Sequence, residues 1–341
     1  MMASRRFDMI ISAAIFLLSL KAWGIEQRAQ LETATGTLHG TFDLPNGTAP
    51  CPVVVIIAGS GPTDRDGNQA LMKNDSLKLL GQALATRGIA ALRYDKRGIA
   101  ESAAAAPREE DLRFEAYAAD VAQWVSWLRQ HPRFLRVALI GHSEGSLIGM
   151  LAAKQTKVDA FVSLAGSSRT ASALIRDQLN TKLAPALKAK SGEILDELVA
   201  GRTVTEVPKE LTALYRPSVQ PYLISWFKYD PVREIAALEV PVLVVQGTAD
   251  LQISVDDAKK LAAAKKGAQL RLIDGMNHVL KHATLLAEQR AAYTDPSLPI
   301  KSEAVEEIIA FLGIEIASAA QRPNQAIETD AKLRRGSSPG R

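Results

Sequence analysis

The sequence predicts an α/β fold: a mostly parallel, doubly wound sheet covered by helices on both faces, with a helical insertion in its second half. Continuous apolar runs without a polar face recur along the chain, which is typical of strands buried on both sides. Segments with apolar residues at helical spacing separate these runs. Strands that alternate with helices in this way form parallel sheets with right-handed crossovers. Between residues 167 and 238 the alternation stops, which indicates the insertion.

The composition is that of a globular protein with a large core, because 47% of the 341 residues are hydrophobic. The net charge of +4 comes from the two ends. Residues 1–24 and 321–341 contain more basic than acidic residues, and the body between them is close to neutral. Binding to nucleic acid is therefore not expected. Cys51 is the only cysteine, so an internal disulfide is excluded.

Residues 1–24 have the order of a secretory signal peptide. Arg5 and Arg6 precede an apolar run from Met9 to Leu20, and Ala22-Trp23-Gly24 supplies a small-x-small cleavage pattern. The alternative is a retained anchor, but twelve apolar residues are too few to span about 30 Å of hydrocarbon. We expect cleavage after Gly24, export to the periplasm or the medium, and no stable membrane insertion.

The first part of the body, residues 25–166, begins with an antiparallel hairpin and a buried strand. Residues 33–44 alternate loosely around two glycines, and Pro45-Asn46-Gly47 supplies a turn, so this segment is expected to form a hairpin at a sheet edge. Residues 53–57 are all Val or Ile, as in a strand covered on both sides. Residues 76–87 place leucines on one helical face, and Gly88 ends that helix.

The next elements repeat the strand and helix alternation. Residues 89–94 form a second buried strand, and a crossover helix follows, because Tyr117 to Leu128 repeats apolar residues at i, i+4, i+7, i+8 and i+11. Residues 135–140 and 161–166 are strand-like, and the apolar residues 147–151 between them have helical spacing.

The insertion, residues 167–238, contains helix-like stretches at 174–190 and 193–199, several prolines and a cluster of aromatic residues. We expect it to lie over the carboxyl edge of the sheet, where Trp226 and Phe227 would contact the substrate; the alternative is a set of surface helices packed elsewhere. The second part of the body, residues 239–320, resumes the alternation with strands at 242–245 and 269–273 and helices at 256–264 and 302–312. Residues 321–341 have the composition of a disordered tail.

A G-x-S-x-G pentapeptide at residues 141–145 lies where a predicted strand meets a predicted helix. In a nucleophile elbow the serine occupies a strained position that projects its hydroxyl above the sheet, and glycines two residues away prevent collisions. The alternative is a serine in an ordinary Gly-rich turn. The strand and helix on either side favour the elbow, with Ser143 as nucleophile.

A serine nucleophile needs a base to take its proton and an acid to orient the base. Asp250 follows the strand at 242–245, and His278 follows the strand at 269–273. Both lie at the carboxyl ends of strands, where open α/β sheets bind their ligands. Ser143, Asp250 and His278 are therefore the predicted catalytic residues.

The loop at residues 58–68, Ala-Gly-Ser-Gly-Pro-Thr-Asp-Arg-Asp-Gly-Asn, has three interpretations. A dinucleotide fingerprint is disfavoured because Asp64 replaces the third glycine and Pro62 disrupts the turn. A calcium loop is disfavoured because Gln69 and Asp75 stand where that loop needs glycine and glutamate. The third interpretation is a loop of small residues whose backbone N–H groups point at a carbonyl oxygen above Ser143.

Five motifs now make a family resemblance clear. They are A-G-S-G-P-T-D-R-D-G-N (58–68), R-Y-D-K-R-G (93–98), G-H-S-E-G (141–145), G-T-A-D (247–250) and M-N-H (276–278). The chain resembles the α/β-hydrolases over residues 30–315, and most closely the bacterial carboxylesterases of the dienelactone-hydrolase and prolyl-oligopeptidase-related branch. The resemblance implies oxyanion donors at the backbone N–H groups of Ser60 or Gly61 and of Glu144. That family's loop more often begins His-Gly, whereas Ala58 precedes Gly59 here.

Other polar residues are expected to have structural roles. His142 would pack beneath the elbow, and His282 lacks the glutamate of a zinc-binding helix. Asp66, Asp95 and Arg97 would tie loops near the site by hydrogen bonds. A structural role is likewise expected for the two remaining histidines, His39 and His131.

The expected function is hydrolysis of a small-molecule carboxylic ester through an acyl-enzyme, with no cofactor and no metal. An acyltransferase, a thioesterase or an aminopeptidase would need no different catalytic residues. A non-catalytic ligand-binding relative would not need the three residues of the triad.

Overall fold

The computed structural model describes residues 25–320, with the backbone alone for 314–320. The predicted signal peptide (residues 1–24) and the predicted tail (321–341) lie outside the described residues and remain predictions.

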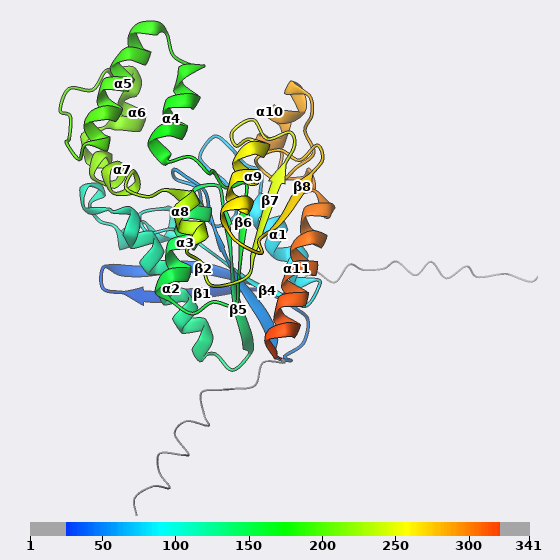
Figure 1. The fold of residues 1–341 in the computed structure, drawn as a ribbon. Helices are drawn as coiled ribbons and strands as arrows, with labels where there is room; N and C mark the ends of the chain where they lie inside the picture. Colours follow the sequence, from blue (N-terminus) through cyan, green and yellow to red (C-terminus); the bar gives the residue numbers. More distant parts are fainter. Residues whose placement is uncertain (1–24, 321–341) are drawn as a thin grey trace, which may run out of the picture.

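An eight-stranded sheet forms the centre of the molecule (Figure 1). The strands lie in the order β1-β2-β4-β3-β5-β6-β7-β8. Strand β2 is antiparallel to both of its neighbours, and all pairs from β4 to β8 are parallel. The strands span Ile25–Thr33 (β1), Gly36–Leu44 (β2), Cys51–Ile57 (β3), Ala90–Tyr94 (β4), Phe134–His142 (β5), Ala160–Leu164 (β6), Val242–Gly247 (β7) and Gln269–Ile273 (β8). The parallel strands all point their carboxyl ends toward the edge where the predicted catalytic residues follow β5, β7 and β8.

Helices cover both faces of the sheet, as the apolar strands require. Helices α2, α3, α8 and α9 pack on one face, and α1 and α11 pack on the other (Figure 1). The bounds are Ser76–Ala85 (α1), Phe114–Gln130 (α2), Glu144–Gln155 (α3), Pro231–Ala236 (α8), Val255–Ala264 (α9), Leu286–Thr294 (α10) and Ser302–Ala320 (α11). Short 3₁₀ helices lie at Ala100–Ala105 (η1) and Glu109–Asp111 (η2). The predicted α/β class is confirmed, while α10 has no counterpart among the predicted elements.

The predicted hairpin has different strands from those expected. Residues 36–44 form one continuous strand, β2, and its partner is β1, which precedes the predicted segment. The reversal occurs at Ala34 and Thr35, and not at Pro45-Asn46-Gly47. Strand β1 was missed because it is an edge strand whose side chains are largely exposed, so it lacks the apolar alternation of a half-buried strand.

The insertion is helical and stands above the carboxyl edge of the sheet (Figure 1). We call its helices α4 to α7 the cap. They span Ala171–Asn180 (α4), Pro185–Val199 (α5), Thr212–Tyr215 (α6) and Gln220–Trp226 (α7), with 3₁₀ turns at Lys209–Leu211 (η3) and Pro217–Val219 (η4). The helix break expected near residues 191–192 occurs instead at residues 181–184. Pro185 begins α5 at a first-turn position, where proline loses no helical hydrogen bond.

Within residues 25–320, no helix is both long and apolar enough to cross a membrane. The same residues contain no cluster of three or more His, Cys, Asp or Glu side chains suited to hold a metal ion.

Candidate active site

Ser143 occupies a sharp turn between β5 and α3. Its backbone has φ 56° and ψ −120°, a conformation that L-residues rarely adopt. The two flanking glycines make the turn possible: a Cβ on Gly141 would lie 2.2 Å from the Gly145 carbonyl oxygen, and a Cβ on Gly145 would lie 2.3 Å from the Ile57 carbonyl oxygen. Strand, strained serine and helix together have the geometry of a nucleophile elbow.

Asp250 and His278 meet across the ends of β7 and β8. The Asp250 carboxylate lies 2.8 Å from His278 Nδ1, and it also accepts hydrogen bonds from the backbone N–H groups of Gln252 and Ile253. Burial alone would raise the pKa of Asp250, but His278 and these hydrogen bonds outweigh it and lower that pKa. An ionised carboxylate only accepts, so Nδ1 holds the proton and Nε2 is the basic nitrogen.

His142 ties the elbow to the His278 loop. Its Nε2 donates to the His278 carbonyl oxygen over 2.8 Å, and the two rings lie 4.9 Å apart between centroids. Burial, and then the neighbouring His278, lower the pKa of His142 to about 4, so its ring is neutral at physiological pH. The predicted structural role of His142 thus corresponds to a direct contact with the loop of the predicted base.

Ser143 and His278 line the same small pocket, of about 110 Å³. Among the described residues, no hydrogen bond joins Ser143 Oγ to His278 in this conformation, whereas the His278–Asp250 bond is formed. In the absence of substrate such catalytic contacts are often long and tighten only in the reacting complex.

The loop after β3 passes directly beside the nucleophile. A Cβ on Gly59 would lie 3.2 Å from the Ser143 Cβ, so a larger side chain at this position would crowd the nucleophile. Ser60 and Gly61 are exposed and line the space in front of Ser143 and Glu144. The structure therefore places the predicted oxyanion donors on both sides of one opening, with Glu144 at the first turn of α3, where the helix dipole favours negative charge.

The rest of this loop is fixed by hydrogen bonds. Asp64 accepts from the backbone N–H groups of Asp66 and Asn68, which closes the turn. Asp66 pairs with Arg93, and Asp95 pairs with Arg65. The two carboxylates of the loop itself, Asp64 and Asp66, thus have partners within the protein.

The remaining polar residues lie away from Ser143. Arg97 forms an ion pair with Asp120 of α2. His39 lies on β2, His131 at the end of α2, and His282 is exposed on the loop after β8.

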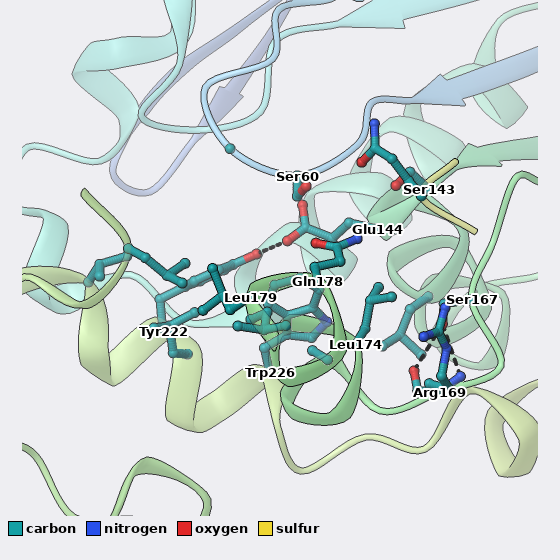
Figure 2. Close-up of a pocket in the computed structure, with 18 of the residues that line it drawn as sticks. Ser60, Ser143, Glu144, Ser167, Arg169, Leu174, Gln178, Leu179, Tyr222 and Trp226 are labelled. Carbon is teal, nitrogen blue, oxygen red and sulfur yellow. Dashed lines mark hydrogen bonds between the residues drawn. The ribbon is translucent and has the colours of Figure 1, made fainter. Parts of the chain in front are cut away.

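A larger cavity, of about 400 Å³, extends from Ser143 beneath the cap (Figure 2). Its wall is mostly apolar and comes from both the cap and the body of the protein. The side chains include Leu147 of α3; Leu174, Ile175 and Leu179 of α4; Tyr222, Leu223 and Trp226 of α7; and Ile253 after β7. Trp226 therefore lines the cavity, and its predicted contact with the substrate stays a prediction.

Phe227 does not line the cavity; it is half-buried against the apolar core. Most of the aromatic cluster docks the cap onto α2, where Phe114 stacks on Trp226 at 5.6 Å and contacts Tyr222 and Tyr229. Sequence reasoning missed the apolar side chains of α4, although Ala171, Leu174, Ile175 and Leu179 recur at i, i+3, i+4 and i+8 on one helix face, which was a usable signal.

Comparison with known proteins identifies the family. A family profile described as serine aminopeptidase, S33, matches residues 75–283, more than half of the chain. Esterase EstD of Thermotoga maritima is 27% identical over 246 residues, which cover 71% of this chain and 58% of EstD, so the chain spans less than two thirds of that relative's length.

Two solved structures show the same fold at low sequence identity. Est1E from Butyrivibrio proteoclasticus has a TM-score of 0.57 at 19% identity and covers 85% of this chain and 99% of its own. The α/β hydrolase GrgF from Penicillium sp. sh18 has a TM-score of 0.58 at 18% identity, and the match covers 86% of this chain and 99% of GrgF. The resemblance to α/β-hydrolases is confirmed, and the finer dienelactone-hydrolase branch stays a prediction. The chain belongs to the serine aminopeptidase S33 family and has the α/β-hydrolase fold.

Proposed function

We propose that the protein is a serine esterase that hydrolyses small carboxylic esters with an apolar acyl chain. The observation that supports this most directly is the position of Ser143 where two cavities of different character meet. Ser60, Gln69, Ser143 and Gln252 line both of them.

In the proposed reaction, His278 Nε2 takes the proton of Ser143 as the hydroxyl oxygen attacks the ester carbonyl. The backbone N–H groups of Glu144 and of Ser60 or Gly61 bind the oxyanion. His278 then gives the proton to the departing alcohol, and water releases the acid from the acyl-enzyme by the same steps.

The two cavities assign the two ends of the ester. His278 lines only the smaller one, and the leaving alcohol must lie beside the group that protonates it. Glu144 lines only the larger one, together with the apolar side chains of the cap. The alcohol is therefore small, and the acyl chain extends beneath the cap. A volume of about 400 Å³ is at the lower end of the usual range for small-molecule sites.

The charges in the larger cavity favour a neutral substrate. Arg169 is paired with Asp257 and Asp177, and Arg216 is paired with Glu109, so both arginines of the wall already have carboxylate partners. An aminopeptidase would need a carboxylate to bind the substrate's terminal ammonium. Among the described residues that line the two cavities, Glu144 is the single carboxylate, and Lys96 and Tyr222 already occupy it. This favours esters over amino-terminal peptides.

A series of p-nitrophenyl esters from acetate to decanoate tests the proposal, with Ser143→Ala as control. We expect kcat/KM to rise with acyl length and then fall once the chain exceeds the cavity, and no turnover by the control. Product analysis with added alcohols separates hydrolysis from acyl transfer. Absence of turnover on every ester by folded protein would contradict the proposal.

We also propose that the protein is exported and that residues 1–24 are removed. The charge, apolar run and cleavage pattern of this segment support the proposal. All eight strands of the described sheet lie within residues 25–273, so cleavage after Gly24 would remove none of them. Intact-mass analysis of protein from a periplasmic fraction should give a chain that starts at Ile25; a full-length species in the membrane fraction would contradict it.

A further inference from the structure

Lys96 is a buried lysine whose ammonium lies behind the nucleophile elbow. It follows β4, and about 1% of its surface is exposed. Its Nζ donates to the Gly59 carbonyl oxygen over 2.6 Å and to Glu144 Oε2 over 2.9 Å, and lies 5.0 Å from the centre of the Tyr117 ring. A buried ammonium is costly unless it is fully paired, and these three partners match its three N–H groups.

Two of these partners belong to the two halves of the proposed oxyanion hole. The Gly59 carbonyl and the Ser60 N–H are the opposite ends of one planar peptide, so holding the carbonyl fixes the direction of the N–H. The same hydrogen bond polarises the peptide and makes its N–H a stronger donor. The second proposed donor is the backbone N–H of Glu144, whose side chain the same ammonium holds.

The cap reaches the same carboxylate from the other side. The Tyr222 hydroxyl of α7 donates to Glu144 Oε1 (Figure 2). Burial raises the pKa of Tyr222 well above its ordinary value, so the hydroxyl keeps its proton. Tyr222 also lines the larger cavity, and its hydroxyl joins the substrate wall to the Glu144 carboxylate.

We propose that Lys96, Glu144 and Tyr222 form a positioning network that sets the geometry of the oxyanion hole and couples it to the docking of the cap. This inference rests on the proposed esterase function. None of the three side chains is assigned a chemical step. They act through the backbone N–H groups of Ser60 and Glu144.

A matched pair of variants tests the network. Tyr222→Phe removes the hydroxyl bonded to Glu144, while Tyr215→Phe removes another buried cap hydroxyl, which is bonded to Ser191 over 3.0 Å and lies outside the cavity wall. With p-nitrophenyl acetate, Tyr222→Phe should lower kcat about tenfold with KM within twofold of wild type. This tenfold loss of kcat is smaller than the loss of about 10²–10³-fold that is typical when an oxyanion donor is removed outright. Tyr215→Phe should leave kcat unchanged.

A trifluoromethyl ketone, which forms a tetrahedral oxyanion adduct with an active serine, supplies the second readout. Its inhibition constant should rise in Tyr222→Phe and in Glu144→Gln by the factor that kcat/KM falls, because the network acts on the oxyanion. Glu144→Gln keeps the backbone donor but cannot accept from both Lys96 and Tyr222 with the same geometry.

The outcomes separate this inference from the function on which it rests. If Tyr222→Phe and Glu144→Gln keep wild-type kcat and inhibitor affinity while the melting temperature falls, the network is structural only and the inference is wrong. If Tyr215→Phe loses kcat equally, the effect is general to the cap, which also contradicts it. If the wild-type protein neither turns over esters nor binds the ketone, the esterase proposal itself fails.

Discussion

The carboxyl edge of the sheet and the cap above it differ in how their site residues are positioned. At the sheet edge, Ser143, Asp250 and His278 each follow a buried strand, so the parallel topology brings them together. The cap has no repeating strand and helix pattern that would fix the position of each side chain. Trp226 lines the cavity, while the adjacent Phe227 packs against the core.

This difference indicates a division of roles. The sheet edge holds the reacting groups in one geometry through strand ends, a strained turn and the Asp250–His278 hydrogen bond. The cap supplies an apolar wall, and through the Tyr222 hydroxyl it contacts Glu144 at the start of α3. We therefore expect changes at the edge to affect the chemical step on all substrates. Changes in the apolar side chains of the cap wall should affect the choice among substrates, whereas loss of the Tyr222 hydroxyl should affect the chemical step.

Ser143→Ala should give the largest effect at the sheet edge. Loss of the nucleophile typically lowers kcat on the order of 10⁴–10⁶. The melting temperature should stay near that of wild type, because the hydroxyl makes little contact with the core. Steady-state kinetics and calorimetry measure both, and a variant with more than about a tenth of wild-type kcat would remove Ser143 from the mechanism.

Asp250→Asn should also lower kcat strongly on every ester, by a factor on the order of 10⁴ at most. The reason is that the amide no longer fixes the proton on His278 Nδ1.

His278→Ala should lower kcat nearly as much as Ser143→Ala. His282→Ala is the matched control, since that exposed ring lies four residues further on. An inactive His282→Ala beside an active His278→Ala would reverse the assignment.

The burial of His142 should make stability depend on pH. The pKa of His142 is lowered to about 4 in the folded protein from an ordinary value of 6.5. Between these values the unfolded chain binds a proton that the folded protein does not, so the free energy of unfolding falls as the pH falls, by about 3 kcal/mol in total. Urea unfolding from pH 7 to pH 4 should show a shallower decline for His142→Gln; parallel curves would refute this contribution.

Trp226→Ala and Phe227→Ala sharpen the comparison within the cap. Removing the Trp226 side chain from the cavity wall should reduce the kcat/KM preference for octanoate over acetate about tenfold. The reason is that each buried methylene contributes about 0.8 kcal/mol. Phe227→Ala should lower the melting temperature and leave the acyl preference unchanged. Uniform loss on all chain lengths in Trp226→Ala would mean that this residue serves only to dock the cap on Phe114.

Much of the fold could be predicted from the sequence, because buried strands and amphipathic helices leave local patterns. The sequence also nominated Ser143, Asp250 and His278 from their places after predicted strands; the structure brings them to one edge of the sheet, and their catalytic roles stay a prediction.

Strand β1 could not be predicted, because it is an edge strand whose side chains are largely exposed and lack apolar alternation. The helix break before Pro185 was also misplaced, because apolar spacing alone did not mark it. The role of Lys96 was missed for a different reason: its partners Gly59 and Glu144 lie 37 and 48 residues away. A charged residue in a loop is normally exposed, so nothing local indicated its burial.

We propose that Ser143 is the activated nucleophile of this site. Labelling by a fluorophosphonate with an alkyl chain, followed by intact-mass analysis and peptide mapping, tests it most directly. We predict a single adduct, located on Ser143, that is lost in Ser143→Ala and strongly slowed in His278→Ala. No adduct on the folded wild-type protein, or an adduct on another residue, would contradict the claim.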